Sequence, residues 1–129
     1  MIGHPVYGKL AENAPKVAYD SYSKAVELDK PNGEYAVKSA KRKDGLYMVA
    51  LNNGVSAYND KNYDAALKSY ELATQINPDD TTAYLYAAYA ADAKEDWSTS
   101  KKYYNKVLSM NHETLPIYRS LVYIAKNVD

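Results

Sequence analysis

The most constraining feature of this sequence is a set of apolar and small residues that recurs at an interval of 34 positions. Two stretches share this register, and the pairs are Tyr63 with Trp97, Tyr70 with Tyr104, Ala73 with Val107, Ile76 with Met110, and Asn77 with Asn111. The same offset leads from Tyr84 to Tyr118 and from Ala91 to Ala125. A repeat of this length is typical of a solenoid of stacked units. Because solenoids present extended surfaces for binding, the sequence favours a binding protein.

The composition is that of one ordinary globular domain. The chain has 129 residues, of which 47% are apolar and 25% are charged, so we expect a single domain over 1–129. Sixteen basic residues balance sixteen acidic ones, and no net field attracts nucleic acid or an anionic membrane. The absence of cysteine excludes disulfides and thiolate metal sites, and it fits any compartment. No apolar run approaches the ~20 residues of a membrane span.

Helix signals come in pairs joined by short turns. The first pair is indicated by apolar spacing up to about Asn59, a turn at 60–62, and a second helical stretch from Tyr63 to Asn77 that Pro78 stops. A turn this tight places the two helices antiparallel.

A second pair follows with the same layout. Thr81 is a plausible N-cap for a helix that reaches Lys94, and Ser98 can cap a further helix that ends near Asn111. The segment 95–98 interrupts the helical pattern between them, which again predicts an antiparallel pair.

These two pairs resemble the tetratricopeptide repeat. Its signature has a small residue midway through the first helix and an aromatic near the start of the second, followed by small, aromatic and small residues and a closing proline. In the central unit these positions are held by Gly54, Tyr63, Ala66, Tyr70, Ala73 and Pro78. In the next unit they are held by Ala88, Trp97, Ser100, Tyr104, Val107 and, in place of proline, His112. The resemblance implies an all-α, right-handed superhelical solenoid of antiparallel helix pairs.

The repeat period is interrupted on both sides of these pairs. An earlier second helix is indicated near the N-terminus, with Pro15 in its first turn. Extra residues before the central unit predict one elongated helix near 34–59, and Thr114 can cap a final helix with Pro116 in its first turn. We expect two full repeats plus flanking half-repeats: a partial repeat at 13–30, an extended repeat at 34–78, a repeat at 81–112 and a half repeat at 114–127.

No constellation of residues indicates catalysis or metal binding. The two histidines, His4 and His112, lack a carboxylate or a second histidine at a spacing that suits zinc. The sequence has no glycine-rich phosphate loop and no nucleophile elbow, and the adjacent Asp79 and Asp80 suit the start of a helix. We therefore expect no enzyme activity, no catalytic or metal-binding residue, no cofactor and no small-molecule substrate.

Candidate binding residues lie on the first helices of the repeats, because the resemblance implies that these helices line a concave groove. The implied groove is aromatic and aliphatic with a few polar groups, which suits a non-catalytic scaffold for a peptide or protein segment. The expected contact residues are Leu51, Asn52, Tyr58, Tyr89, Asp92, Arg119 and Tyr123. A subset of the family grips a free C-terminal carboxylate at positions held here by Leu51, Val55, Tyr86, Pro116 and Ser120. We therefore expect no such clamp.

Two other functions are consistent with the sequence. The final helix lacks a partner to cover four apolar side chains, Tyr118, Leu121, Val122 and Ile124. This favours self-association into a homo-oligomer, or a spacer role within a larger protein. A basic segment at 38–43 suits weak contact with RNA or an acidic surface through Lys38, Lys41, Arg42 and Lys43. Four charges bind phosphates weakly at physiological salt, so we expect no nucleic-acid partner.

Overall fold

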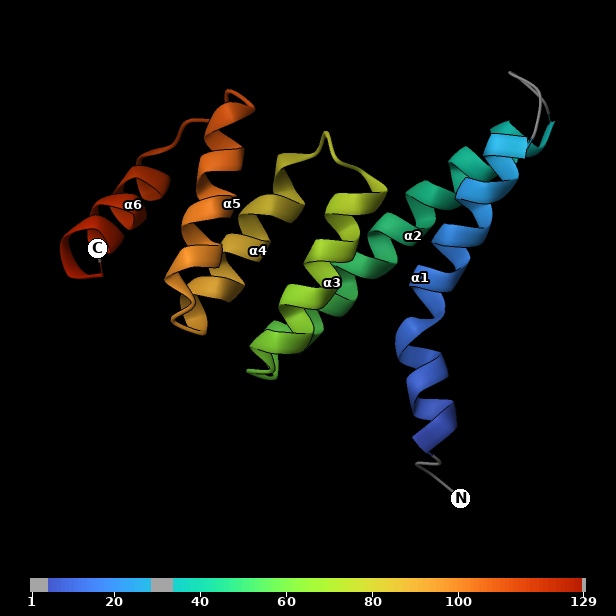
Figure 1. Ribbon diagram of the computed structural model, residues 1–129, viewed down its shortest axis with the longest axis horizontal. Coiled ribbons are helices and arrows are strands. Elements are labelled where there is room, and N and C mark those ends of the chain that lie inside the picture. Colours follow the sequence, from blue (N-terminus) through green and yellow to red (C-terminus); the bar gives the residue numbers. More distant parts are fainter. Residues whose placement is uncertain (1–4, 29–33, 129) are drawn as a thin grey trace.

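The computed structural model describes residues 5–28 and 34–128. Over these residues the protein is all-α, with six helices and no strand. The helices are α1 (Pro5–Leu28), α2 (Glu34–Asn59), α3 (Tyr63–Ile76), α4 (Thr81–Ala93), α5 (Trp97–Ser109) and α6 (Leu115–Asn127). Each helix packs against its neighbours in sequence, and Figure 1 shows them following one another in a row from α1 to α6.

The helix positions agree closely with the sequence except at the N-terminus. The elongated helix predicted near 34–59 is confirmed as α2, which continues through Gly45 without a break. The prediction that Pro15 lies in the first turn of its helix is wrong, because α1 begins ten residues earlier at Pro5. A first helical position suits proline, since the backbone N–H that proline lacks would have no partner there. Pro15 instead lies inside α1 and removes one internal hydrogen bond.

The N-caps repeat at the 34-residue interval, although two of them differ from the predicted ones. Asn62 Oδ1 accepts a hydrogen bond from the Ala65 amide at 3.3 Å. Thirty-four positions later, Asp96 Oδ1 accepts from the Thr99 amide at 3.2 Å. Asp96 therefore caps α5 instead of Ser98.

The cap of α4 also differs from expectation, whereas the N-cap residue of α6 is the predicted one. Asp80, one residue before Thr81, caps α4 by accepting from the Thr82 amide at 2.8 Å. This hydrogen bond holds the pKa of Asp80 below its usual range. Thr114 occupies the N-cap position of α6 without a side-chain hydrogen bond.

The turns that end α2 and α4 are also equivalent. Lys61 and Glu95, 34 positions apart, have φ of 60° and 61°, in the left-handed region that favours glycine. The next amides reach back to the last helical turn, from Asn62 N to Ala57 O and from Asp96 N to Ala91 O, both at 2.9 Å or less. This is a Schellman motif, which satisfies carbonyls that a helix end leaves open. The repeat in the sequence is thus a repeat of backbone geometry.

Small residues let the central helices approach one another closely. In α4, which packs against both α3 and α5, five alanines are fully buried: Ala83, Ala87, Ala88, Ala90 and Ala91. In α2, Gly54 lies against the ring of Tyr70 from α3, and a Cβ atom there would lie 2.3 Å from Tyr70 Cε1. These contacts fix how α2 and α4 present their other side chains.

Candidate functional site

A pocket of about 230 Å³ opens between α2, α3 and α4, and we call it the tyrosine pocket. Its walls are Val55, Tyr58, Tyr70, Tyr86 and Tyr89. Tyr70 is buried and forms an edge-on contact with Tyr86 at 5.5 Å between ring centroids. Tyr58 and Tyr89 are each 36% exposed, so their rings remain available to a partner. No charged side chain lines this pocket.

A second pocket, of about 360 Å³, lies farther along the row of helices between α4, α5 and α6, and we call it the mixed pocket. Its lining combines an acid, a base, a hydroxyl and two aromatic rings: Asp92, Trp97, Arg119, Ser120 and Tyr123. Trp97 and Tyr123 are in contact at 5.5 Å between ring centroids. Arg119 is exposed, and within the described part of the chain no carboxylate forms an ion pair with it. Its guanidinium therefore has donors available for a ligand.

Tyr104 is a buried residue that contacts one residue of each pocket. Its ring is 1% exposed and contacts Tyr89 of the tyrosine pocket at 6.3 Å between centroids. Its hydroxyl donates to Asp92 Oδ2 of the mixed pocket at 2.5 Å, and Ser100 Oγ donates to the other carboxylate oxygen. Asp92 is thereby held in place by two donors from α5. We refer to the tyrosine pocket and the mixed pocket together as the groove.

The structure brings five of the seven predicted contact residues into the groove. Tyr58 and Tyr89 line the tyrosine pocket, and Asp92, Arg119 and Tyr123 line the mixed pocket. Asn52 is exposed on α2 and lines neither pocket.

Leu51 is only 8% exposed and belongs to the core, so it does not face a ligand. The preceding residue, Ala50, is 1% exposed, and the Leu51 side chain likewise packs against neighbouring helices. We therefore leave Leu51 out of the contact set.

From the sequence alone, two residues of the groove were expected to serve packing and not ligand contact. Tyr70 and Trp97 belong to the repeat signature, which predicts packing, yet each also forms part of a pocket wall. Whether each ring reaches a pocket wall depends on how neighbouring helices diverge, and periodicity does not report that angle. The sequence did indicate Tyr86 and Ser120 as possible groove residues, because both fall on the helix faces expected to line the groove.

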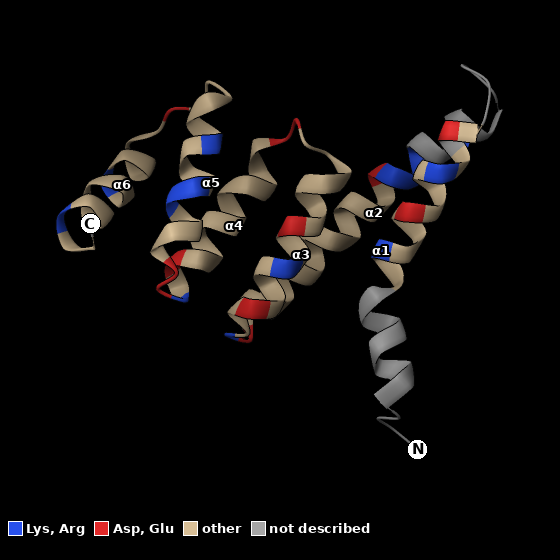
Figure 2. Ribbon diagram, viewed as in Figure 1, with Lys and Arg blue, Asp and Glu red and all other residues tan. Residues whose placement is uncertain are grey.

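Burial raises the pKa of two pocket tyrosines, Tyr70 and Tyr89. It raises the pKa of Tyr70 to about 12, with the hydroxyls of Tyr86 and Tyr58 adding to the effect. Burial also raises the pKa of Tyr89, with a further contribution from the charge of Asp92. These hydroxyls therefore remain hydrogen-bond donors at neutral pH. The surroundings add little charge, because Asp92 is the single charged residue of α4, which is almost entirely tan in Figure 2.

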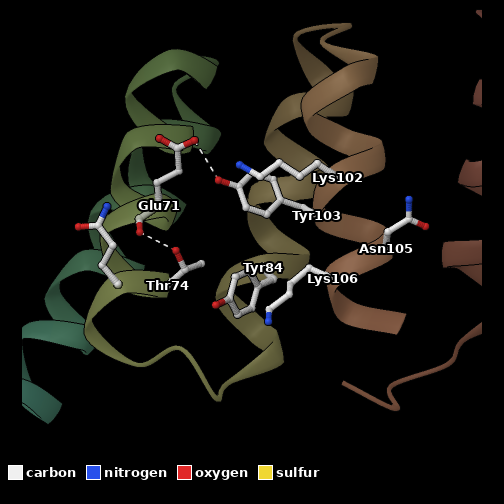
Figure 3. A pocket seen from close by; sticks show the side chains of 8 residues that line it. Glu71, Thr74, Tyr84, Lys102, Tyr103, Asn105 and Lys106 are labelled. Atoms are coloured by element: carbon white, nitrogen blue, oxygen red, sulfur yellow. Dashed lines mark hydrogen bonds between the residues drawn. The ribbon is translucent and has the colours of Figure 1, made fainter. Parts of the chain in front are cut away.

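A larger pocket, of about 750 Å³, lies between α3, α4 and α5, and charged and polar side chains are among those that line it (Figure 3). Tyr103 Oη donates to Glu71 Oε1 at 2.9 Å. Lys102 Nζ lies 5.1 Å from the Tyr103 ring centroid, and Lys106 Nζ lies 5.6 Å from that of Tyr84. Because the protein's own lysines already cover both rings, this lysine pocket offers a ligand less aromatic surface than the groove does.

The basic segment at 38–43 is partly used within the fold. Arg42 Nη1 donates to Tyr22 Oη at 2.6 Å, with the guanidinium 5.4 Å from that ring's centroid. Lys43 Nζ lies 5.3 Å from the ring centroid of Tyr19. Two of the four basic side chains therefore contact α1, which leaves them less available to bind nucleic acid.

The apolar residues of α6 divide into two groups. Tyr118 and Val122 are exposed by 43% and 51%, while Leu121 is partly buried. Ile124 is 2% exposed, so the expectation that it lies uncovered is wrong. It packs in the same core as Ile117, on the side of α6 that meets the rest of the protein.

The described residues contain no group of three or more His, Asp or Glu side chains placed to hold a metal ion. Within the same part of the chain, no helix is both long and apolar enough to cross a bilayer. A scan against known protein families and a search of curated proteins find no match for this sequence. The tetratricopeptide resemblance therefore stays a prediction that rests on the residues quoted above.

Proposed function

We propose that this protein is a non-catalytic binding module of tetratricopeptide type that holds a segment of a partner protein in the groove. The observation that carries the proposal is the continuous aromatic wall formed by Tyr70, Tyr86 and Tyr89, whose successive ring centroids lie 5.5 and 6.5 Å apart. Tyrosine and tryptophan are the residues that most often dominate binding energy at protein interfaces. A row of them beside a pocket is the usual setting for an anchor side chain.

The two pockets suit different parts of one ligand. The tyrosine pocket is uncharged and favours an apolar anchor. In the mixed pocket, Asp92 already accepts from Ser100 and Tyr104, whereas Arg119 has unused donors. An acidic side chain or a backbone carbonyl of the ligand suits Arg119 best. The proposed ligand therefore has an apolar anchor followed or preceded by an acidic or carbonyl-rich stretch.

A random-peptide display library tests this function without knowledge of the natural partner. We expect selection on the wild-type protein to enrich peptides with an apolar anchor and a nearby acidic residue. The double variant Tyr58→Ser/Tyr89→Ser is expected to bind these peptides at least about tenfold more weakly, since each hot-spot residue contributes about 2 kcal/mol or more. Fluorescence anisotropy with the enriched peptides gives the affinities.

Tyr118→Ser is the matched control, because Tyr118 is also an exposed tyrosine but lies outside the groove. Its affinity for the enriched peptides should equal that of the wild type. The proposal fails if selection enriches no peptide, or if the double variant and Tyr118→Ser bind the enriched peptides equally well. Circular dichroism of each variant establishes that the helices are intact.

Self-association through α6 is a second candidate, and the exposure of Leu115, Tyr118 and Val122 supports it. A surface of this kind is commonly covered by a neighbouring chain. Sedimentation velocity over a range of concentrations separates the two candidates. A monomer at every concentration would remove self-association and leave the groove proposal unaffected.

A further inference from the structure

We infer that the groove takes an extended, proline-containing segment, with a proline ring in the tyrosine pocket and backbone carbonyls on the surrounding tyrosine hydroxyls. This inference rests on the proposed function and specifies the conformation and chemistry of its ligand. Three properties of the groove lead to it: the size of the tyrosine pocket, its hydroxyl groups and its lack of charge.

The size of the tyrosine pocket limits what enters it. A drug-sized ligand fills a pocket of roughly 300–1,000 Å³, and the 230 Å³ here suits one compact side chain. The walls are ring faces and edges with one aliphatic residue, Val55. A proline ring is compact, apolar and rigid, so it fits between aromatic walls with little loss of conformational entropy.

The hydroxyl groups of the walls distinguish an extended ligand from a helical one. Tyr58, Tyr70, Tyr86 and Tyr89 bring four phenolic groups to one small site. A polyproline II segment has no internal hydrogen bonds, so all its carbonyls can accept from these groups. A helical peptide has already used most of its carbonyls internally. The walls therefore offer donors that only an extended ligand can use fully.

The charge distribution agrees with the same ligand. No charged side chain lines the tyrosine pocket, and the groove as a whole has one acidic residue, Asp92, and one basic residue, Arg119. Asp92 accepts hydrogen bonds from Ser100 and Tyr104, and Arg119 adds a positive charge, so the groove holds little net attraction for a cationic helix. Proline residues carry no charge and no N–H group, and their tertiary amides are good acceptors. Aromatic-lined grooves are a known way of binding such segments.

A direct titration tests the inference with probes of defined conformation. The probes are fluorescein-labelled decaproline, a helix-forming peptide of alanine, leucine and lysine, and a glycine-serine peptide, all of equal length and amidated at the C-terminus. Anisotropy should give saturable binding of decaproline, at least about tenfold tighter than that of the other two probes. Tyr58→Ser/Tyr89→Ser should weaken decaproline binding by at least about tenfold, while Tyr118→Ser should leave it unchanged.

Tyr89→Phe is a second variant that keeps the ring and removes one hydroxyl. It should weaken decaproline binding by a few fold, about the effect of one hydrogen bond, without affecting folding. The inference is overturned if the helix-forming peptide binds more tightly than decaproline, or if the groove variants leave decaproline binding unchanged. If the display library yields groove-dependent peptides that lack proline while decaproline fails to bind, the ligand class is wrong and the proposed function stands. If no peptide of any kind binds, both are wrong.

Discussion

Replacing Tyr104 with alanine is expected to lower the free energy of unfolding by about 3–5 kcal/mol, as for other large aromatic residues in cores. Tyr104 is among the largest fully buried side chains, and it joins α5 to α4 through its contacts with Tyr89 and Asp92. Because small domains have only about 5–15 kcal/mol in total, the variant should lose much of its stability. Urea unfolding followed by circular dichroism measures the loss.

Tyr104→Phe separates packing from hydrogen bonding at the same position. The ring remains, but Asp92 loses one of its two donors, so we expect a smaller loss of about 1–3 kcal/mol. Peptide affinity should also fall, because the Asp92 carboxylate is then held in the mixed pocket by Ser100 alone. Equal stability of Tyr104→Ala and the wild type would contradict the described core.

Replacing Gly54 with alanine is expected to destabilise the protein by about 1–2 kcal/mol, against the ordinary helix preference. Alanine normally gains about 1 kcal/mol over glycine inside a helix. Here its Cβ would lie within 3 Å of three atoms of the buried Tyr70 ring, and such overpacking costs about 1–3 kcal/mol or more. The displaced ring also forms a wall of the tyrosine pocket, so peptide binding should weaken as well.

Gly45→Ala in the same helix is the matched control. No atom lies within 4 Å of a Cβ built at Gly45, and the residue is exposed in the interior of α2. We expect this variant to be more stable by about 0.5–1 kcal/mol, the helix preference alone. Opposite signs in the two variants, measured by urea unfolding, would establish the close approach of α2 and α3. Stabilisation by both would contradict it.

The sequence predicted the helices well because their signals are periodic and repeated. Apolar spacing and the stop at Pro78 bring the predicted ends of α3 within one residue of the observed ones. The caps were harder, since Asp96 and Ser98 are both good N-cap residues. The choice is made by the left-handed turn at Glu95, which places Asp96 next to the first amides of α5. The residue types around the start of α5 do not by themselves predict this turn geometry.

The site was predicted in part, for a related reason. Helix faces follow from register, which is why Tyr58, Tyr89 and Tyr123 were identified. Leu51 was included on the same grounds, but its exposure depends on how closely the neighbouring helices approach α2. The repeat signature assigned Tyr70 to packing alone. In a thin helical layer, however, one residue can belong both to the core and to a pocket wall. Register identifies a face, and only tertiary packing determines which of its residues remain accessible.

The most direct test of the groove is a ¹H–¹⁵N NMR titration of the labelled protein with a peptide enriched from the library. Trp97 is the single tryptophan and lines the mixed pocket, so its indole N–H gives one unambiguous signal at the proposed site. We predict that this signal shifts together with the amides of Tyr58 and Tyr89. Shifts confined to the lysine pocket around Lys102 and Asn105, with Trp97 unmoved, would contradict the account.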